Sequence, residues 1–377
     1  MPTLAHIFDK EDIKALWAYA FNEQEPFLSE YFDNFWKAEN AVILKSDCLI
    51  GALQMIPYNI SLRGTTLPAS YIVGVSIAPE ERGKKYSTKL MRDCLIEQKN
   101  RGEAISLLIP FSYEFYKKLD YRLCYTLNVY ETEAMNIPSF KEEYSVKKMN
   151  LEDFSLLNRV YNKFCKDKNG YILREKCDWE YIFFEHKLFG GFIYGAYSGE
   201  KLKGYVSYNK SGNEFYVREL VYTDRHSLFC LLQFIKSHFS ANKVIKIRTA
   251  NDGLLLRILR EPKNTLKQVP TVMARIVDIS ATLSLFDIGN LKFDIYDNLF
   301  EENCGVYEKI NDSIAQTDNA KYDVSMSIGT LTQLVMGICS ASELHFLGLI
   351  KAEDKIINRL NEIFPKTENY INHIMEE

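Results

Sequence analysis

The sequence lacks an apolar run long enough to cross a membrane, and its first residues show no apolar core behind a basic start. Its eight cysteines include no Cys-x-x-Cys pair, so neither a zinc site nor a disulfide framework is indicated. It also lacks the excess of basic residues that a nucleic-acid-binding face needs, because 46 Lys and Arg are balanced by 50 Asp and Glu. We therefore expect a cytoplasmic protein that binds no nucleic acid, membrane or metal ion.

The length and composition indicate a globular protein of several domains. A chain of 377 residues is too long for one ordinary core, so two or three domains are expected. Hydrophobic residues make up 47% and charged residues 25% of the chain, as is typical of globular proteins. Aromatic residues reach 13%, which is enough for large cores or for a pocket with aromatic walls.

A short basic turn between an apolar strand, 71–77, and an amphipathic helix is the most informative stretch. From Arg82 to Arg92 there are five Lys or Arg and no acid. A strand that leads into a helix through a tight turn leaves backbone N–H groups free to bind an anion, and positive charge strengthens the attraction. The turn is therefore a candidate phosphate site, although a solvated basic helix start would give the same pattern.

The order of elements expected around this turn is partly repeated later in the chain. A helix begins near Asp9 and another near Asn150, and hairpin-like strands follow each of them. In the second copy the turn at 222–227 has no glycine and carries an acid. We therefore expect a duplicated fold in which only the first copy keeps the phosphate site.

The pattern changes again near residue 281, where strands are followed by short helices with caps expected at Thr330 and Ser340. This predicts a separate α+β domain. The expected domains are 1–140, 141–280 and 281–377.

Tyr116 is the candidate catalytic residue, because it lies beyond the strand expected at 104–109. General acid–base catalysis needs one group that accepts a proton and another that donates one. A tyrosine with a pKa near 10 keeps its proton at neutral pH and suits the second role. The ordinary role of one tyrosine among 24 is packing.

The basic turn resembles motif A of the GNAT acetyltransferases, R/Q-x-x-G-x-G/A, which grips the pyrophosphate of acetyl-coenzyme A. Arg82 stands at the first position of the motif, whereas Lys85 and Ser87 occupy the two later small positions. With the segments Pro110–Tyr121 and Leu62–Pro68, the sequence resembles the enhanced intracellular survival (Eis) acetyltransferases, most closely the versions from low-GC Gram-positive bacteria.

Similarity at 270–278 and 334–344 extends this resemblance over essentially the whole chain. The fold it implies is α/β and α+β, with tandem GNAT folds, whose mixed central sheets are flanked by helices, followed by a sterol-carrier-like α+β domain. The first GNAT domain would be catalytic and the second would have a degenerate cofactor site. A homo-oligomer is implied too, a hexamer by resemblance.

The resemblance also implies roles for individual residues. Tyr116 falls on the family's general acid, and the family's general base is the carboxylate at the chain's own C-terminus, which makes Glu377 the candidate. Phe21 and Trp36 are candidate walls of the amine pocket, although core packing is the more ordinary role for each. The residues that would hold acetyl-CoA, the acetyl donor, are Val75, Ser76, Ile77, Arg82, Gly83, Lys84, Lys85 and Tyr86.

The sequence departs from the family at three places. Lys85 replaces a glycine of the phosphate turn, and Asp120 replaces a glycine after the tyrosine. The chain ends Met375-Glu376-Glu377, whereas the family commonly ends on an aromatic residue. The last departure leaves open whether the terminal carboxylate or a glutamate side chain is the base.

The expected activity is acetyl transfer from acetyl-CoA to a primary amine of a small molecule, such as an aminoglycoside, polyamine or lysine-like acceptor. Two alternatives stay open: a non-catalytic protein that binds CoA or lipid, and a tandem GNAT that transfers a larger acyl or aminoacyl group. The residues do not identify the acceptor.

Overall fold

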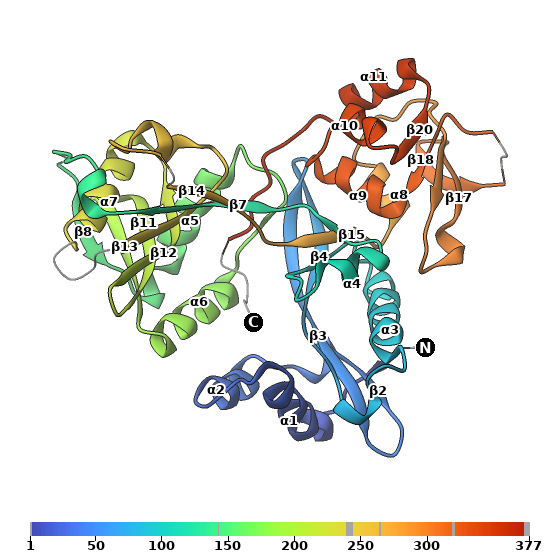
Figure 1. The fold of residues 1–377 in the computed structure, drawn as a ribbon, viewed down its shortest axis with the longest axis horizontal. Coiled ribbons are helices and arrows are strands. Elements are labelled where there is room, and N and C mark those ends of the chain that lie inside the picture. The colour runs from blue at the N-terminus through green and yellow to red at the C-terminus, as the bar shows by residue number, and fades with distance from the viewer. Residues whose placement is uncertain (1, 142, 239–243, 264, 319–320, 373–377) are drawn as a thin grey trace. The chain divides into compact units, whose positions relative to one another are not determined.

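The computed structural model describes residues 2–141, 143–238, 244–263, 265–318 and 321–372. These residues form two compact units (Figure 1). The first unit contains the chain up to Tyr125 together with Thr271–Asn369, and the second contains Thr126–Pro270 together with the residues from Tyr370 onward to 372.

The first unit is built on a sheet whose strands follow the order β1-β2-β3-β4-β5-β15-β6. Helix α1 (Lys10–Phe21) begins after Asp9, as expected, and buries Ile13, Leu16 and Trp17. Helix α3 (Tyr86–Asn100) packs against β2, β3 and β4 (Figure 1). The strands are β1 (Thr3–Leu4), β2 (Ala41–Lys45), β3 (Leu49–Leu62), β4 (Thr65–Ile77), β5 (Ile105–Leu108), β6 (Arg122–Leu123) and β15 (Met273–Ile276).

Strand β3 is continuous from Leu49 to Leu62, although it contains a proline. Pro57 lies within it and is paired in register with Ser70 of β4. On the other side of β3, pairing with β2 extends only to Gln54. A proline within a strand is tolerated where no neighbouring strand needs its missing N–H.

The second unit repeats the same arrangement of strands and helices. Its sheet has the order β14-β7-β13-β12-β11-β10-β8, and helix α7 (Arg225–Lys236) follows β12 as α3 follows β4. Helices α5 (Phe154–Cys165) and α6 (Lys176–Leu188) complete the unit. The strands are β7 (Thr126–Thr132), β8 (Ser145–Lys148), β10 (Gly191–Ser198), β11 (Lys201–Ser211), β12 (Glu214–Tyr222), β13 (Val244–Thr249) and β14 (Leu266–Pro270).

Two strands belong to a sheet other than the one that the sequence position suggests. β7, inside the expected first domain, pairs with β13 and β14 of the second sheet. β15, inside the expected second domain, pairs with β5 and β6 of the first sheet. β15 lies beside β5, and β7 lies beside β13, which is the equivalent place in the other sheet. The two copies therefore exchange one strand. The boundaries at residues 140 and 280 therefore do not coincide with the division between sheets.

The C-terminal part of the first unit has its own five-stranded sheet, β18-β17-β16-β19-β20, with helices α8 to α11. Helix α9 (Ile328–Met336) is capped by Ser327 and not, as expected, by Thr330, because the Ser327 hydroxyl accepts from the Thr330 N–H. Ser340 caps α10 (Ala341–Phe346) as expected. The remaining elements are α8 (Ile279–Leu283), β16 (Phe293–Tyr296), β17 (Gly305–Ile310), β18 (Ser313–Thr317), β19 (Val324–Ser327), β20 (Ile350–Ala352) and α11 (Asp354–Ile363).

Buried polar contacts join this C-terminal part to the first sheet. Arg275 of β15 forms an ion pair of 2.6 Å with Asp297, and both side chains are almost fully buried. Arg63, at the turn between β3 and β4, donates hydrogen bonds to the carbonyl oxygens of Val335 and Pro365. A buried ion pair is sensitive to the loss of either partner, so these contacts fix the C-terminal part on the first sheet.

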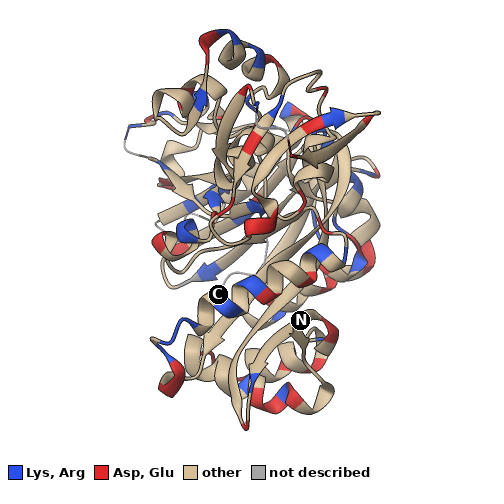
Figure 2. Cartoon of the chain, turned by 90° about the vertical axis from the view of Figure 1, so that its right-hand side faces the viewer, with Lys and Arg blue, Asp and Glu red and all other residues tan. Residues whose placement is uncertain are grey.

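The charged residues of the chain are distributed over its elements with both signs interspersed (Figure 2). Within the described part of the chain, we find no helix that combines the length and the apolar character needed to span a bilayer.

Lys85, at the N-cap of α3, has φ 63° and ψ 17°, a left-handed conformation that costs a non-glycine residue about 1 to 2 kcal/mol. Replacing Lys85 by glycine is therefore expected to raise the free energy of unfolding by about 1 kcal/mol, measured by urea denaturation. Lys85→Ala is the control, since it removes the same charge and keeps the Cβ. If Lys85→Gly and Lys85→Ala unfold with the same free energy, the left-handed backbone conformation is not the source of the instability.

Candidate active site

A cleft of about 470 Å³ opens in the first domain beside the end of β4 and the start of α3. It combines apolar walls with a basic end, as small-molecule sites commonly do. The residues that line it are Ala20, Phe21, Val75, Ser76, Ile77, Glu81, Arg82, Gly83, Lys85, Tyr86, Ser87 and Phe111.

The cleft lies where two parallel strands separate. β5 pairs with β4 only from Ala69 to Ile72. The register between β3 and β4 shifts directly beyond this point, between the pair Gln54–Val73 and the pair Ala52–Ser76, which marks a β-bulge. A bulge bends its strand and ends local pairing. The last residues of β4 therefore present one backbone edge to the cleft instead of to β5.

Gly74 makes the bulge possible. Its φ is +68°, and a Cβ at this position would lie 2.3 Å from the Trp17 ring of α1. Glycine is the residue that takes this conformation without strain and allows such close approach. Trp17 is 3% exposed, so α1 packs tightly onto the bent part of β4. An isolated glycine in a strand pattern is the signal from which this bulge could have been expected.

The basic end of the cleft is the N-terminus of α3. The first N–H groups of a helix have no acceptor within the helix, and no described side chain caps α3. Gly83 has φ +79° and nothing within 4 Å of an added Cβ, so the turn is open at this residue. The first turn of α3 contains no acid. The helix dipole and the unpaired N–H groups together favour an anion here.

Charged side chains around this turn are tied to their neighbours. Arg82 Nε donates to the Ile77 carbonyl at 3.3 Å, and its guanidinium lies 5.6 Å from the centre of the Tyr19 ring. Lys84 pairs with Glu81 at 2.9 Å, and this hydrogen bond raises the pKa of the exposed Lys84 amine. Glu81 lines the cleft and Lys84 does not. Arg82 and Lys85 therefore supply the positive charge at the cleft wall.

Tyr116 lies on α4 (Tyr113–Lys118), whose N-cap is Ser112. It is 2% exposed, and its ring packs edge-on against Phe111 with 5.4 Å between ring centres. Phe111 lines the cleft, whereas Tyr116 is not among the described lining residues. The structure thus places Tyr116 directly behind an aromatic wall of the cleft.

The two candidate walls of the amine pocket differ. Phe21 lines the cleft at the end of α1. Trp36 is 7% exposed and stacks on Phe32 with 6.1 Å between ring centres, which puts it in the packed aromatic cluster of α1 and α2 (Phe27–Asn34) and not at the cleft. Glu377, the candidate base, lies outside the described residues.

In the second domain the N-terminus of the corresponding helix, α7, is capped by a side chain. The Asp224 side chain accepts a hydrogen bond from the Ser227 N–H at 2.8 Å, and the two residues form a capping box on α7. A carboxylate that already satisfies these N–H groups repels a phosphate from the same place. Among the described residues, no three His, Cys, Asp or Glu side chains are grouped in a way that could hold a metal ion.

Of the residues predicted from the sequence, Phe21, Val75, Ser76, Ile77, Arg82, Gly83, Lys85 and Tyr86 line the cleft. The lining residues that were not predicted are Ala20, Glu81, Ser87 and Phe111. Phe111 and Ala20 carried no distinguishing signal, because apolar residues near a strand end or a helix end usually pack in the core.

Three family models match separate parts of the chain. An acetyltransferase (GNAT) domain matches residues 4–124, a second acetyltransferase (GNAT) domain matches residues 170–276, and a sterol carrier protein domain matches residues 279–372. Among proteins with curated descriptions, none matches the chain.

Several solved structures share the fold over nearly their whole length. A probable N-acyltransferase of Enterococcus faecalis is 23% identical, with a TM-score of 0.85 and coverage of 98% of this chain and 97% of that one. A GCN5-related N-acetyltransferase of Anabaena variabilis is 19% identical, with a TM-score of 0.86 and coverage of 98% of each chain. Eis1 of Mycobacterium abscessus is 16% identical, with a TM-score of 0.79 and coverage of 97% of each chain.

The order of domains in the family matches agrees with the two similar units and the C-terminal sheet. The tandem arrangement expected from the sequence is confirmed. The chain is a GNAT-type acetyltransferase in which two GNAT domains are followed by a sterol carrier protein domain.

Proposed function

We propose that this acetyltransferase transfers the acetyl group of acetyl-CoA to a primary amine of a small molecule, and that the first GNAT domain alone performs the reaction. The observation that carries the proposal is the cleft in that domain, where a free backbone edge of β4 leads to an uncapped, basic helix start. An extended amide-containing arm with a pyrophosphate at one end is complementary to such a cleft.

The residues present fit acetyl-CoA. The backbone of Val75, Ser76 and Ile77 would bind the pantetheine arm, since β5 does not pair with this part of β4. Ser76 would act through its backbone alone, because its hydroxyl donates to the Ala52 carbonyl at 3.3 Å. The phosphates would be held by the turn formed by Arg82, Gly83, Lys84, Lys85 and Tyr86.

Two groups would move protons. Tyr116 would donate its phenol proton to the sulfur of the departing thiolate, because a phenol stays protonated at neutral pH. A carboxylate at the chain's end, with Glu377 as the candidate, would accept the proton of the amine, which must be neutral to attack. Phe21 would form a wall of the amine site. A homo-oligomer, a hexamer by resemblance, stays a prediction.

Acceptors with several amines, such as aminoglycosides, polyamines or lysine-like molecules, would suit a site that joins a carboxylate to an aromatic wall. The test is release of free CoA thiol with a panel of these amines. We expect release with at least one amine and none without an amine. Binding of acetyl-CoA without release for any amine would contradict the proposal and favour a CoA-binding protein.

Arg82→Glu is expected to weaken acetyl-CoA binding by about 10- to 100-fold, because a charged hydrogen-bonding group at the phosphates is replaced by a repelling one. Calorimetry of the wild type should give one acetyl-CoA per chain.

Arg225→Glu is the matched control, since Arg225 begins the corresponding helix α7 behind the Asp224 cap. It should leave the affinity unchanged. Two equivalent acetyl-CoA molecules per chain, or equal losses in both variants, would show that the second domain also binds the donor.

Tyr116→Phe is expected to lower kcat by about 10²- to 10⁴-fold and to leave the Kd of acetyl-CoA unchanged, as the loss of a general acid does. Tyr113→Phe, on the same helix, is the control: burial raises the pKa of Tyr113, so it also keeps its proton. Full activity of Tyr116→Phe would leave Tyr116 a packing residue, and a selective loss in Tyr113→Phe would move the acid to Tyr113.

A further inference from the structure

The second sheet contains the same separation of parallel strands that opens the cleft of the first. β12 pairs with β13 only from Glu214–Val244 to Val217–Ile247. The register between β11 and β12 shifts directly afterwards, opposite Arg218. The backbone at Arg218 and Glu219 is therefore the counterpart of the edge that β4 presents to the cleft in the first domain.

The C-terminal segment of the chain occupies this place. Asn372 Nδ2 donates to the Arg218 carbonyl oxygen at 2.8 Å, and the Tyr370 hydroxyl donates to Glu219 Oε1 at 3.1 Å. Tyr370 and Asn372 are 1% and 3% exposed. The Tyr370 N–H also donates to the Asn169 carbonyl oxygen at 3.1 Å. The segment thus binds the two bulge residues through its side chains and Asn169 through its backbone.

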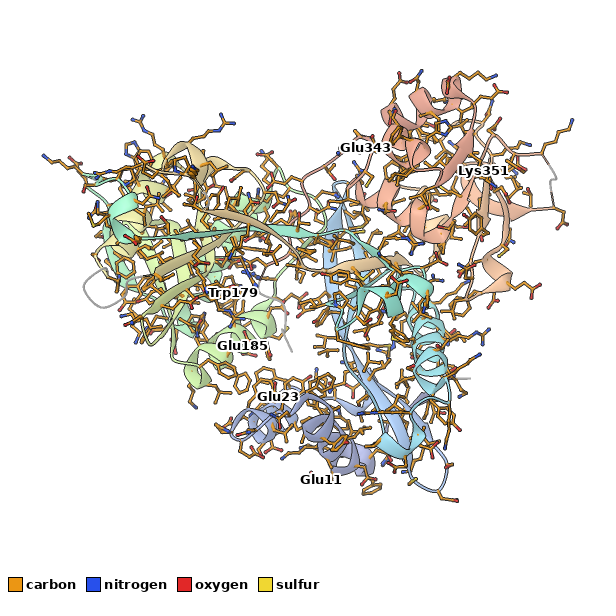
Figure 3. All side chains as sticks on the ribbon, in the orientation of Figure 1. Glu11, Glu23, Trp179, Glu185, Glu343 and Lys351 are labelled. Carbon is orange, nitrogen blue, oxygen red and sulfur yellow. The ribbon has the colours of Figure 1, made fainter. Side chains whose placement is uncertain are left out.

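A buried ion pair lies beneath the segment. Arg174 Nη1 and Nη2 donate to the two carboxylate oxygens of Glu219 at 2.9 and 2.8 Å, and the Tyr205 hydroxyl donates to Glu219 Oε2 at 2.6 Å. The guanidinium lies 3.9 Å from the centre of the Tyr161 ring and 5.0 Å from that of Trp179, which comes from α6 (Figure 3). A buried pair of this kind is stable only when its remaining hydrogen-bonding groups are also satisfied.

The segment supplies two of those hydrogen bonds. Arg174 Nη2 donates to the Asn372 carbonyl oxygen at 2.9 Å, and Glu219 accepts from Tyr370 as described. Burial and the charge of Glu219 raise the pKa of Tyr370 well above its usual value, so its hydroxyl remains a donor. Removing the segment would leave hydrogen-bonding capacity of a buried arginine and a buried glutamate unused, which is costly.

We infer that the second GNAT domain is an anchor for the C-terminal segment. The gap between its strands holds Tyr370 and Asn372, and Arg174 and Glu219 are positioning residues that hold this segment in place. This deepens the proposed function and rests on it, since a general base carried on the chain's end must start from a fixed place. It also gives the second domain a role without a cofactor.

The test compares Tyr370→Phe with Tyr208→Phe in the full-length chain. Tyr208 is an equally buried tyrosine of the same domain whose ring stacks on Phe215 with 4.4 Å between ring centres, away from the segment. Hydrogen exchange followed by mass spectrometry reports on the peptide that contains Tyr370–Asn372. Tyr370→Phe should speed exchange in this peptide by about tenfold, because a bond to a buried charge is lost.

With a responsive amine, Tyr370→Phe should also lower kcat by about tenfold while the Kd of acetyl-CoA stays within about twofold of the wild type, because only the placement of the base changes. Tyr208→Phe should change neither quantity. Asn372→Ala provides a second, independent loss of contact and should act in the same direction as Tyr370→Phe.

The outcomes separate the two ideas. Unchanged exchange in both segment variants overturns the anchor, whatever the activity. Faster exchange with unchanged kcat overturns the positioning role and leaves a purely structural contact. A wild type that releases no CoA thiol overturns the proposed function, while the exchange result still decides whether the segment is anchored.

Discussion

The separation of β4 from β5 beyond Ile72 is the constraint on which the candidate site depends. Parallel strands normally continue their hydrogen-bond ladder, and here the ladder ends because the bulge at Gly74 turns β4 away. Trp17 fills the space that a side chain at Gly74 would need, so α1 and the bulge stabilise each other. The cleft, the free backbone edge and the position of the α3 N-terminus all follow from this bend.

The second domain has a similar backbone at this place, but different side chains occupy its helix N-terminus and the gap between its strands. The strands separate in the same way, but Asp224 closes the helix start and Tyr370 and Asn372 fill the gap. The interactions that replace a ligand are of the kinds that would bind one: a charge at a helix N-terminus and hydrogen bonds to an unpaired strand edge. The second GNAT domain therefore has the same separation of strands, and a segment of its own chain occupies it.

The sequence predicted what depends on local chemistry. The start of α1 after Asp9 and the contrast between the two helix starts depend on residues close together in the chain. It did not predict the exchange of β7 and β15, because strand pairing over more than a hundred residues leaves no local signal. Trp36 was a candidate wall of the amine pocket with core packing as its more ordinary role, and it stacks on Phe32 in the aromatic core.

Asp120 and Lys85, which replace glycines of the family, both have a positive φ but differ in the contacts that stabilise it. Asp120 has φ +60° and is fully buried, and its carboxylate accepts hydrogen bonds from Arg122 Nη2 at 3.1 Å and from the Asn298 N–H at 3.3 Å. Its conformation is thus stabilised by fold contacts. Lys85 has a similar φ, but among the described residues its side chain makes no hydrogen bond or ion pair. Strain without local compensation is typical of functional sites, which favours a functional role for the turn at Lys85 at the basic end of the cleft.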